Sequence, residues 1–268
     1  MKSRAPTPAL LRRQHALMAV ALLGLIAAAL LLVAPAGRRA HATTDRCGVS
    51  GDLATLDMTL PHVAKALEAG GPIVIVAFGS SSTYGTGASA RDKTYPSRLA
   101  ALLTRRLPRA NIVVLNRGVG GETAATTLDR IDSDAIAAHP DLVIWQVGTN
   151  DVLRDVDPLA AGAVIREGVT RMQRAGIDVV LMDVQFAPAV LQHAIFREME
   201  RVIAAEGRLL GVPVIHRFAM MREWAEEGRM PLSLMISRDH LHMTDASYDC
   251  LARRIGRSIA LAARSTGS

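Results

Sequence analysis

The sequence of 268 residues predicts a doubly wound α/β domain, in which helices cover both faces of a parallel sheet. Three observations predict this fold class. Five short apolar runs recur along the chain, a helix-like segment follows each of them, and several runs are rich in Val and Ile without polar alternation. Unbroken apolar runs are typical of parallel strands that are buried on both faces. No repeat or linker interrupts the order between residues 47 and 264, so we expect one domain there.

The expected elements alternate along the chain. Strands are expected over residues 73–78, 112–115, 142–147, 179–184 and 212–215, because each range is an apolar run of strand length. Helices are expected over residues 95–107, 124–138, 159–175, 189–206, 220–227 and 244–263. Thr244 is expected to be the N-cap of the last helix. Right-handed crossovers then bring the C-terminal ends of all strands to one edge, where such sheets bind ligands.

The N-terminal 42 residues have the layout of a secretory signal. Four basic residues precede an uncharged run over residues 16–37, and Ala40-His41-Ala42 then offers a small-x-small cleavage site. The uncharged run is also long enough to span a bilayer as an uncleaved anchor, although Pro35 and Gly37 favour cleavage. We therefore expect residues 1–42 to be a signal peptide or membrane anchor and residues 43–268 to be an exported domain, periplasmic or secreted.

Charge and composition restrict the class of partner. Hydrophobic residues make up 50% of the chain, so a sizeable core is expected. The net charge of +6 suggests nucleic acid at first sight, but six of the 31 basic residues and none of the 25 acidic residues lie in residues 1–42. The exported part is formally neutral, so we exclude nucleic acid as a partner. A membrane is expected as a partner only through the N-terminal segment, if that segment is uncleaved.

The two cysteines, Cys47 and Cys250, both lie in the exported part. In an oxidising compartment they predict one disulfide between the N-terminal arm and the last helix. The alternative is two unrelated buried thiols.

Polar residues typical of acyl transfer follow the expected strands. They form four blocks: 79–83 (GSSST) after the first strand, 116–123 (NRGVGGET) after the second, 148–151 (GTND) after the third, and 239–242 (DHLH) before the last helix. Together they supply hydroxyl groups, backbone amides beside glycine, a side-chain amide, and a carboxylate with an imidazole. These are the groups of a serine-hydrolase site.

The fourth block can activate a serine. A serine hydroxyl becomes a good nucleophile when an imidazole takes its proton, and a carboxylate holds that imidazole in one tautomer. Asp239 and His242 are three residues apart in a turn and can meet locally, leaving the second ring nitrogen for the serine loop. The candidate donors to an oxyanion are the backbone N–H groups of Ser81 and Gly121 and the side-chain amide of Asn150.

Each block alone has an ordinary structural explanation, as a serine-rich turn, a helix cap or surface polar residues. His240 and His242 could suggest a metal, but no third ligand stands at a useful spacing. The glycines at 118, 120 and 121 do not have the spacing of a dinucleotide loop, and the chain has no Gly-x-Ser-x-Gly elbow. We therefore expect no metal and no cofactor.

Taken in order, the four blocks resemble those of the SGNH (GDSL-type) esterases and lipases, a family named for a Ser, Gly, Asn and His in separate blocks. The first block of that family reads Gly-Asp-Ser-Leu-x-x-Gly, and residues 79–85 (GSSSTYG) are similar to it. The resemblance implies that Ser81 is the nucleophile, that Asp239 and His242 complete the triad, and that Ser81, Gly121 and Asn150 form the oxyanion hole. Ser80 stands where the family usually has Asp, which bears on how the serine loop is held.

The resemblance also implies a fold and an activity. The fold is a flavodoxin-like three-layer α/β/α sandwich with a five-stranded parallel sheet. The activity is that of an exported serine esterase that hydrolyses a glycan O-acyl or O-acetyl group, or a lipid or lysophospholipid ester, through an acyl-enzyme. The alternatives are an acyltransferase with the same intermediate and a catalytically idle carbohydrate- or lipid-binding relative. Gln185 and Phe186, at the exit of the fourth strand, are expected to line the acyl pocket.

Overall fold

The computed structural model of the chain describes residues 45–54 and 59–265. The signal peptide or membrane anchor expected within residues 1–42 lies outside the described residues. In the described part, no helix is both long enough and apolar enough to cross a membrane.

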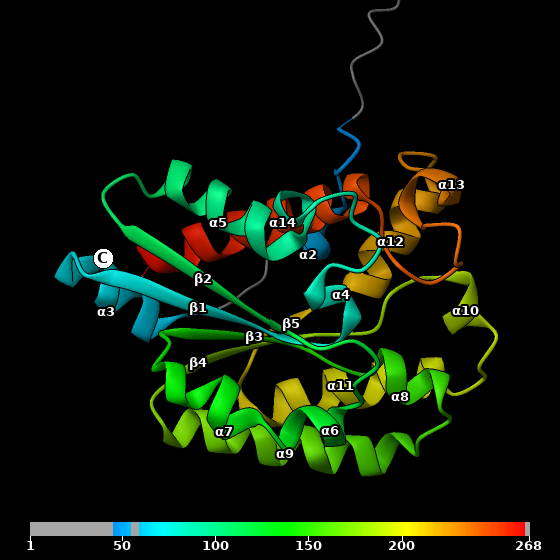
Figure 1. The fold of residues 1–268 in the computed structure, drawn as a ribbon, viewed down its shortest axis with the longest axis horizontal. Helices are drawn as coiled ribbons and strands as arrows, with labels where there is room; N and C mark the ends of the chain where they lie inside the picture. Colours follow the sequence, from blue (N-terminus) through cyan, green and yellow to red (C-terminus); the bar gives the residue numbers. More distant parts are fainter. Residues whose placement is uncertain (1–44, 55–58, 266–268) are drawn as a thin grey trace, which may run out of the picture. The chain divides into compact units, whose positions relative to one another are not determined.

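A parallel sheet of five strands forms the centre of the fold (Figure 1). The strands are β1 (Pro72–Gly79), β2 (Asn111–Gly118), β3 (Leu142–Gln146), β4 (Asp178–Met182) and β5 (Val214–Ile215). Their spatial order is β2-β1-β3-β4-β5, and every neighbouring pair is parallel. This is the flavodoxin-like order, so the predicted fold class is confirmed.

The burial of the strands explains their sequence pattern. Every residue of β3 and β4 is buried, as is nearly all of β1, because helices cover the sheet on both sides. These strands therefore carry unbroken apolar runs. The edge strand β2 is only half-buried along its length.

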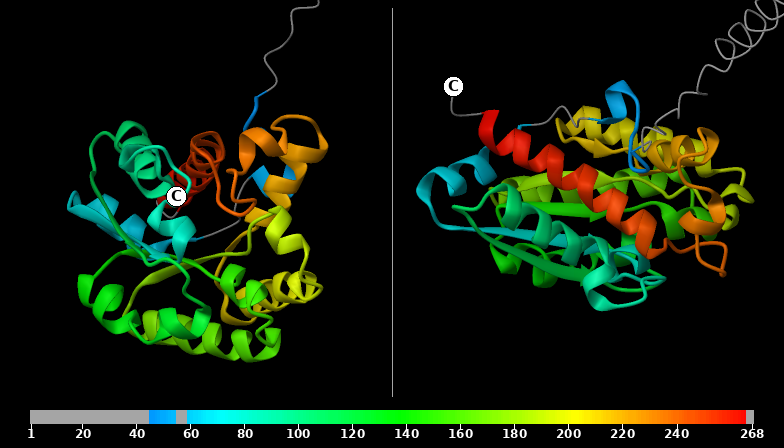
Figure 2. Two further views of the ribbon diagram at one scale, coloured as in Figure 1. Left: turned by 45° about the vertical axis from the view of Figure 1, so that its right-hand side comes forward. Right: turned by 90° about the horizontal axis from the view of Figure 1, so that it is seen from above.

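Two layers of helices enclose the sheet (Figures 1 and 2). One layer contains α3 (Pro61–Ala69), α5 (Tyr95–Arg106) and α14 (Asp245–Ser265), with α5 and α14 lying side by side. The other contains α6 (Ala124–Leu128), α7 (Ile131–Asp134), α9 (Pro158–Arg174) and α11 (Phe196–Leu210). The remaining elements are α2 (Gly51–Ala54), α4 (Ser81–Tyr84), η1 (Arg91–Lys93), η2 (Ile136–Ala138), α8 (Thr149–Leu153), α10 (Pro188–Leu191), α12 (Arg217–Glu226) and α13 (Leu232–Met235).

Two helices that the sequence predicted as continuous are interrupted. The helix expected over residues 124–138 is divided into α6, α7 and η2. The first of the two breaks includes Arg130, whose guanidinium donates to the carbonyl of Gly79 at 3.0 Å. The helix expected over residues 189–206 is divided into α10 and α11, and His193 in the break binds the Asp155 carboxylate at 3.0 Å. In both cases a residue between the two helices makes a contact with a distant part of the chain.

Thr244 directly precedes α14, in the N-cap position expected from the sequence. The hydroxyl donates to the carbonyl of Leu234 at 2.5 Å, which attaches α13 to the start of α14. The N–H of Thr244 instead donates to the Ser247 hydroxyl at 3.0 Å.

A disulfide pairs Cys47 with Cys250, and their Cα atoms are 4.8 Å apart, within the usual range. The bridge connects the N-terminal segment to α14 across 203 residues of sequence.

Candidate active site

The four polar blocks meet at the C-terminal edge of the sheet. Ser81 is the first residue of α4, directly after β1, and Asn150 lies in α8, directly after β3. Gly121 follows β2, and residues 239–242 lie in the loop that precedes α14. The topology therefore brings side chains that are up to 161 residues apart in sequence within reach of one another.

Ser81, His242 and Asp239 form a continuous hydrogen-bonded chain. The Ser81 hydroxyl oxygen lies 2.9 Å from His242 Nε2. On the other side of the ring, Nδ1 lies 2.6 Å from a carboxylate oxygen of Asp239. The carboxylate thus fixes Nδ1 as the protonated nitrogen and leaves Nε2 to accept the serine proton.

Asp239 remains ionised although the loop partly buries it. Burial acts to raise the pKa of Asp239, but hydrogen bonds from Ser237, His242 and two backbone N–H groups outweigh it and hold the pKa well below its usual range. The Ser237 hydroxyl donates at 2.6 Å, and the N–H groups of Leu241 and His242 donate at 3.0 and 2.9 Å. The same contacts also fix the orientation of the carboxylate.

The three consecutive serines have different partners. The Ser80 hydroxyl donates to the side-chain carbonyl of Gln146 at 2.9 Å, and the Ser82 hydroxyl donates to that of Gln185 at 2.8 Å. Both serines are 1% exposed. Ser81 alone faces His242, so the hydrogen bonds distinguish three hydroxyls that are chemically alike.

Gln146 was not expected from the sequence as part of the site. Its side-chain oxygen also accepts the N–H of Ser80 at 2.9 Å and the Thr83 hydroxyl at 3.3 Å, so it holds the serine loop in the absence of the Asp usual at position 80. The available signal was a polar residue that ends an otherwise apolar strand.

Gln185 connects two segments of the candidate site, the one after β1 and the one before α14. It is 1% exposed, and its amide nitrogen donates to the carbonyl of Leu241 at 2.6 Å while its oxygen accepts from Ser82. Phe186 is partly exposed and packs edge-on against Phe218, with ring centroids 5.4 Å apart. Contact of Gln185 and Phe186 with substrate stays a prediction.

The expected oxyanion donors lie at the start of α4, in the loop after β2 and in α8. The N–H of Ser81 begins a helix and has no helical acceptor, and Gly121 has φ of +80°, a conformation that suits glycine. The Asn150 amide donates to the carbonyl of Glu122 at 2.8 Å, which leaves its second N–H for another acceptor. Their joint role as an oxyanion hole is a proposal, developed below.

The loop that carries Gly121 is held from both sides. The Asp151 carboxylate accepts the N–H of Ala124, with both oxygens at 3.1 Å. Glu122 forms a largely buried ion pair with Arg130, which also donates to the carbonyl of Gly79 at the end of β1. Glu122 therefore links the second block to the first.

A buried arginine lies behind the third block. Arg217 is 0% exposed and donates to the Thr149 hydroxyl at 3.1 Å and to the carbonyl of Asp183 at 2.8 Å. Burial lowers the pKa of Arg217 to about 10, against the opposing attraction of Asp183, so it is charged at neutral pH. No pattern in the sequence indicated this residue.

Within residues 45–54 and 59–265, no group of three or more His, Cys, Asp or Glu residues stands close enough to hold a metal ion. His240, the second histidine of the block, adopts a left-handed backbone conformation with φ of 61°.

Curated relatives match parts of this chain. An uncharacterized lipoprotein of Bacillus subtilis, YqeF, is 29% identical over 129 residues, which cover 46% of this chain and 53% of the relative. An acetylxylan esterase of Geobacillus stearothermophilus is 35% identical over 79 residues, covering 30% of this chain and 33% of the esterase. The matches thus span about half or less of each relative.

Solved structures show the same fold. A mutant of Axe2, an acetyl-xylooligosaccharide esterase of Geobacillus, superposes with a TM-score of 0.60 at 22% identity, covering 70% of this chain and 94% of that one. A two-domain esterase, CEX, that is active on acetylated mannans gives a TM-score of 0.62 at 20% identity, covering 77% and 53%.

One family model matches nearly all of the described part, over residues 46–265. Together with the esterase neighbours it confirms the resemblance to SGNH-type hydrolases that the four sequence blocks indicated. The chain belongs to the Non-GDSL lipase-like family.

Proposed function

We propose that this protein is a serine esterase that hydrolyses a carboxylic ester through an acyl-enzyme. The observation that carries the proposal is the chain of two hydrogen bonds from the Ser81 hydroxyl through His242 to Asp239, 2.9 and 2.6 Å long. This is the arrangement that serine hydrolysis requires, with a nucleophile, a base and a carboxylate that orients the base.

In the proposed reaction, Ser81 Oγ attacks the ester carbonyl carbon while its proton moves to His242 Nε2. Collapse of the tetrahedral intermediate breaks the bond to the alcohol oxygen, which leaves with the proton from His242. Water then gives a proton to the same nitrogen and attacks the carbonyl carbon of the acyl-serine. Collapse of this second intermediate releases the acid, and His242 returns the proton to Ser81 Oγ. Asp239 stabilises the imidazolium in both halves of the reaction.

The negative charge on the carbonyl oxygen needs donors that are already in place. The N–H groups of Ser81 and Gly121 and the second N–H of Asn150 are the proposed donors, and loss of one such donor typically costs about 3–4 kcal/mol of barrier. The bond from Asn150 to Glu122 supports this assignment because it holds the amide at the edge of the site before substrate arrives.

For the substrate we propose an O-acetylated glycan. The acetylxylan esterase among the relatives and the mannan-active esterase among the solved structures support this choice. An open groove of about 590 Å³, lined by Tyr84 and Gly85 just after Ser81 in sequence, supports it as well. Tyr84, three residues after Ser81 in α4, lines this groove and is 64% exposed, which suits an aromatic platform for a sugar ring. Arg91 and Asn116 add donors for hydroxyl groups.

A second candidate substrate is a lipid ester, favoured by exposed apolar side chains on segments next to the site. Val119 precedes Gly121 and is 45% exposed, and Leu232 and Leu234 on α13 are 40% and 37% exposed. Such side chains could contact an acyl chain or a lipid surface.

Export and acyl transfer complete the proposal. A domain over residues 43–268, preceded by a leader, suits an exported enzyme, and a lipoprotein among the relatives supports export. The acyl-enzyme could also give its acyl group to a sugar hydroxyl in place of water.

The test is a series of p-nitrophenyl esters from acetyl to palmitoyl, with acetylated xylo- and manno-oligosaccharides assayed for acetate release. We expect a sharp acetyl optimum and release of acetate, both reduced at least about 10⁴-fold in Ser81→Ala. A palmitoyl optimum would select the lipid candidate. Unreduced hydrolysis in Ser81→Ala, or none in the unchanged protein, would contradict an esterase site at Ser81.

A further inference from the structure

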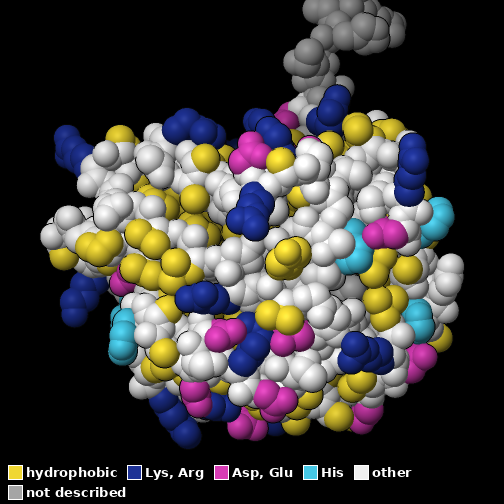
Figure 3. Space-filling view, viewed as in Figure 1, with side chains coloured by type: hydrophobic (Ala, Val, Ile, Leu, Met, Phe, Trp, Pro, Cys, Tyr) yellow, Lys and Arg dark blue, Asp and Glu magenta, His cyan; other side chains and the backbone are white. Residues whose placement is uncertain are grey.

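Five arginines converge on a pocket of about 410 Å³ between α5 and α14, far in sequence from the serine loop. They are Arg105 and Arg106 at the end of α5, and Arg253, Arg254 and Arg257 on α14. Asp45 is the one acidic residue among those that line the pocket. In Figure 3, Lys and Arg side chains are spaced along the upper edge of the molecule, where Figure 1 places these two helices.

Only part of this positive charge is neutralised. Arg253 pairs with Asp249 at 2.7 Å. Arg254 is 3.5 Å from Asp45 and also donates to the carbonyl of Cys47 at 2.6 Å. Within the described part of the chain, no acidic partner is found for Arg105 or Arg257.

The arrangement is unfavourable for the protein alone. Arg253 and Arg257 are four residues apart on α14, where like charges destabilise a helix. Burial, and then the nearness of Arg257 and Arg229, lower the pKa of Arg254 against the attraction of Asp45. The exported part has equal numbers of acidic and basic residues, so this concentration of one sign is local.

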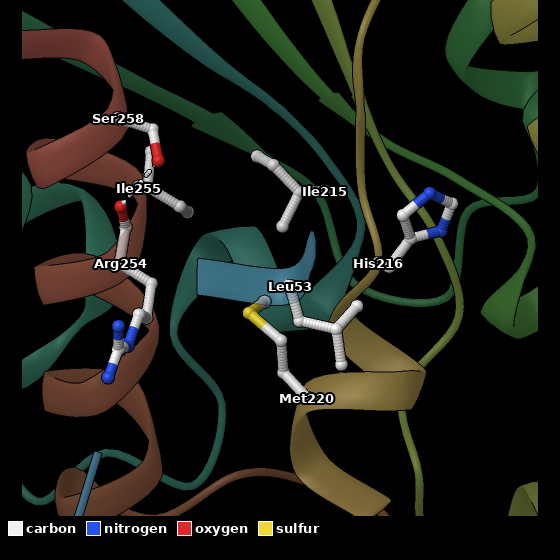
Figure 4. A pocket seen from close by; sticks show the side chains of 7 residues that line it. All are labelled: Leu53, Ile215, His216, Met220, Arg254, Ile255 and Ser258. Atoms are coloured by element: carbon white, nitrogen blue, oxygen red, sulfur yellow. Dashed lines mark hydrogen bonds between the residues drawn. The ribbon is translucent and has the colours of Figure 1, made fainter. Parts of the chain in front are cut away.

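We propose that this pocket binds phosphate groups. Planar guanidinium groups form paired hydrogen bonds with phosphate oxygens, and arginines on two helices can bind more than one phosphate. A bound anion would also relieve the repulsion among the cations. The hollow in Figure 4, between Ile215 of β5 and Ile255 of α14, fits less well because it holds about 10 Å³, roughly one water.

Two sources of phosphate are consistent with this chemistry. Asp45 and Cys47 line the pocket and stand a few residues after the expected leader, residues 1–42. The apolar run of that leader is long enough to span a bilayer. A phospholipid headgroup is therefore one source. A soluble polyphosphate or phosphate-bearing polymer is the other.

Thermal unfolding of the full chain, purified in a non-ionic detergent, tests the proposal with two probes. One is inorganic tripolyphosphate and the other is a short-chain phosphatidylglycerol, each compared with NaCl at matched ionic strength. We expect at least one probe to raise the unfolding midpoint by about 3 °C or more at saturation. A response to tripolyphosphate identifies a soluble source, and a response to the lipid alone identifies a headgroup.

Arg257→Gln and Arg105→Gln test the location from each helix in turn. Each should abolish most of the response and leave the midpoint without probe unchanged or higher, because a repelling charge is removed. Arg174 is an exposed arginine at the end of α9, so Arg174→Gln is the matched control. This variant should respond like the unchanged protein. No response to either probe, or an undiminished response in both pocket variants, would overturn the proposal.

Discussion

At the scale of single residues, hydrogen-bond partners distinguish Ser81 from the two serines beside it. Ser80, Ser81 and Ser82 have the same chemistry, and only the resemblance to a family motif selected Ser81 from the sequence. The structure adds a physical reason, because Ser80 and Ser82 are turned into the protein and bonded to Gln146 and Gln185. That reason could not be read from the sequence, since both glutamines come from distant strand ends.

The Asp239 carboxylate is expected to control the tautomer of His242. Asp239→Asn keeps the size of the side chain but removes its negative charge and replaces one acceptor oxygen by an NH₂ donor. We therefore expect kcat to fall by about 10⁴-fold with little change in KM. Steady-state kinetics on p-nitrophenyl acetate measures this. A loss of less than tenfold would contradict the role given to Asp239.

The pH dependence follows from the same residue. Because its hydrogen bonds hold the pKa of Asp239 below its usual range, the carboxylate stays ionised as pH falls through the region where an imidazole gains its proton. In the unchanged protein, the acid limb of kcat/KM should therefore reflect one protonation, with a slope of one. A slope of two would show that a second group, such as Asp239, titrates there.

At the scale of elements, the sequence predicted strands better than helix ends. The strands were found because apolar runs buried on both faces leave a clear pattern, as β3 and β4 show. The breaks at Arg130 and His193 were missed because they depend on Gly79 and Asp155, partners that only the folded chain brings close. Local patterns do not contain such contacts.

The bridge between Cys47 and Cys250 of α14 is expected to stabilise the protein. Replacing Cys47 and Cys250 together by serine should lower the free energy of unfolding by about 2–5 kcal/mol, because the unfolded chain regains a long open loop. Denaturant unfolding of the exported protein measures this. Esterase activity should be retained, because the hydrogen bonds of the site do not involve either cysteine.

A thiol titration of the exported protein under denaturing conditions is the matched control. Two free thiols per chain would show that Cys47 and Cys250 are unpaired in the purified protein. An unchanged unfolding free energy in the double variant would contradict the stabilising role.

At the scale of the whole molecule, the fold and the convergence of the four blocks were predictable for one reason. A parallel sheet with right-handed crossovers places every strand's C-terminal end at one edge, so the three blocks that directly follow strands were expected to meet there. The supporting residues were not predictable in this way. Gln146, Arg130 and Arg217 act through contacts across the sheet, and the arginine pocket depends on α5 and α14 lying side by side.

The central claim is that Ser81 alone is an activated nucleophile. A fluorophosphonate probe tests it most directly, because the serine oxygen displaces fluoride and keeps the phosphonyl group. We predict one adduct per chain, located by fragmentation of the tryptic peptide over residues 66–91 to Ser81, retained in Ser80→Ala and Ser82→Ala and absent from Ser81→Ala and from heat-denatured protein. An adduct on Ser80 or Ser82, or labelling that persists in Ser81→Ala, would contradict the account.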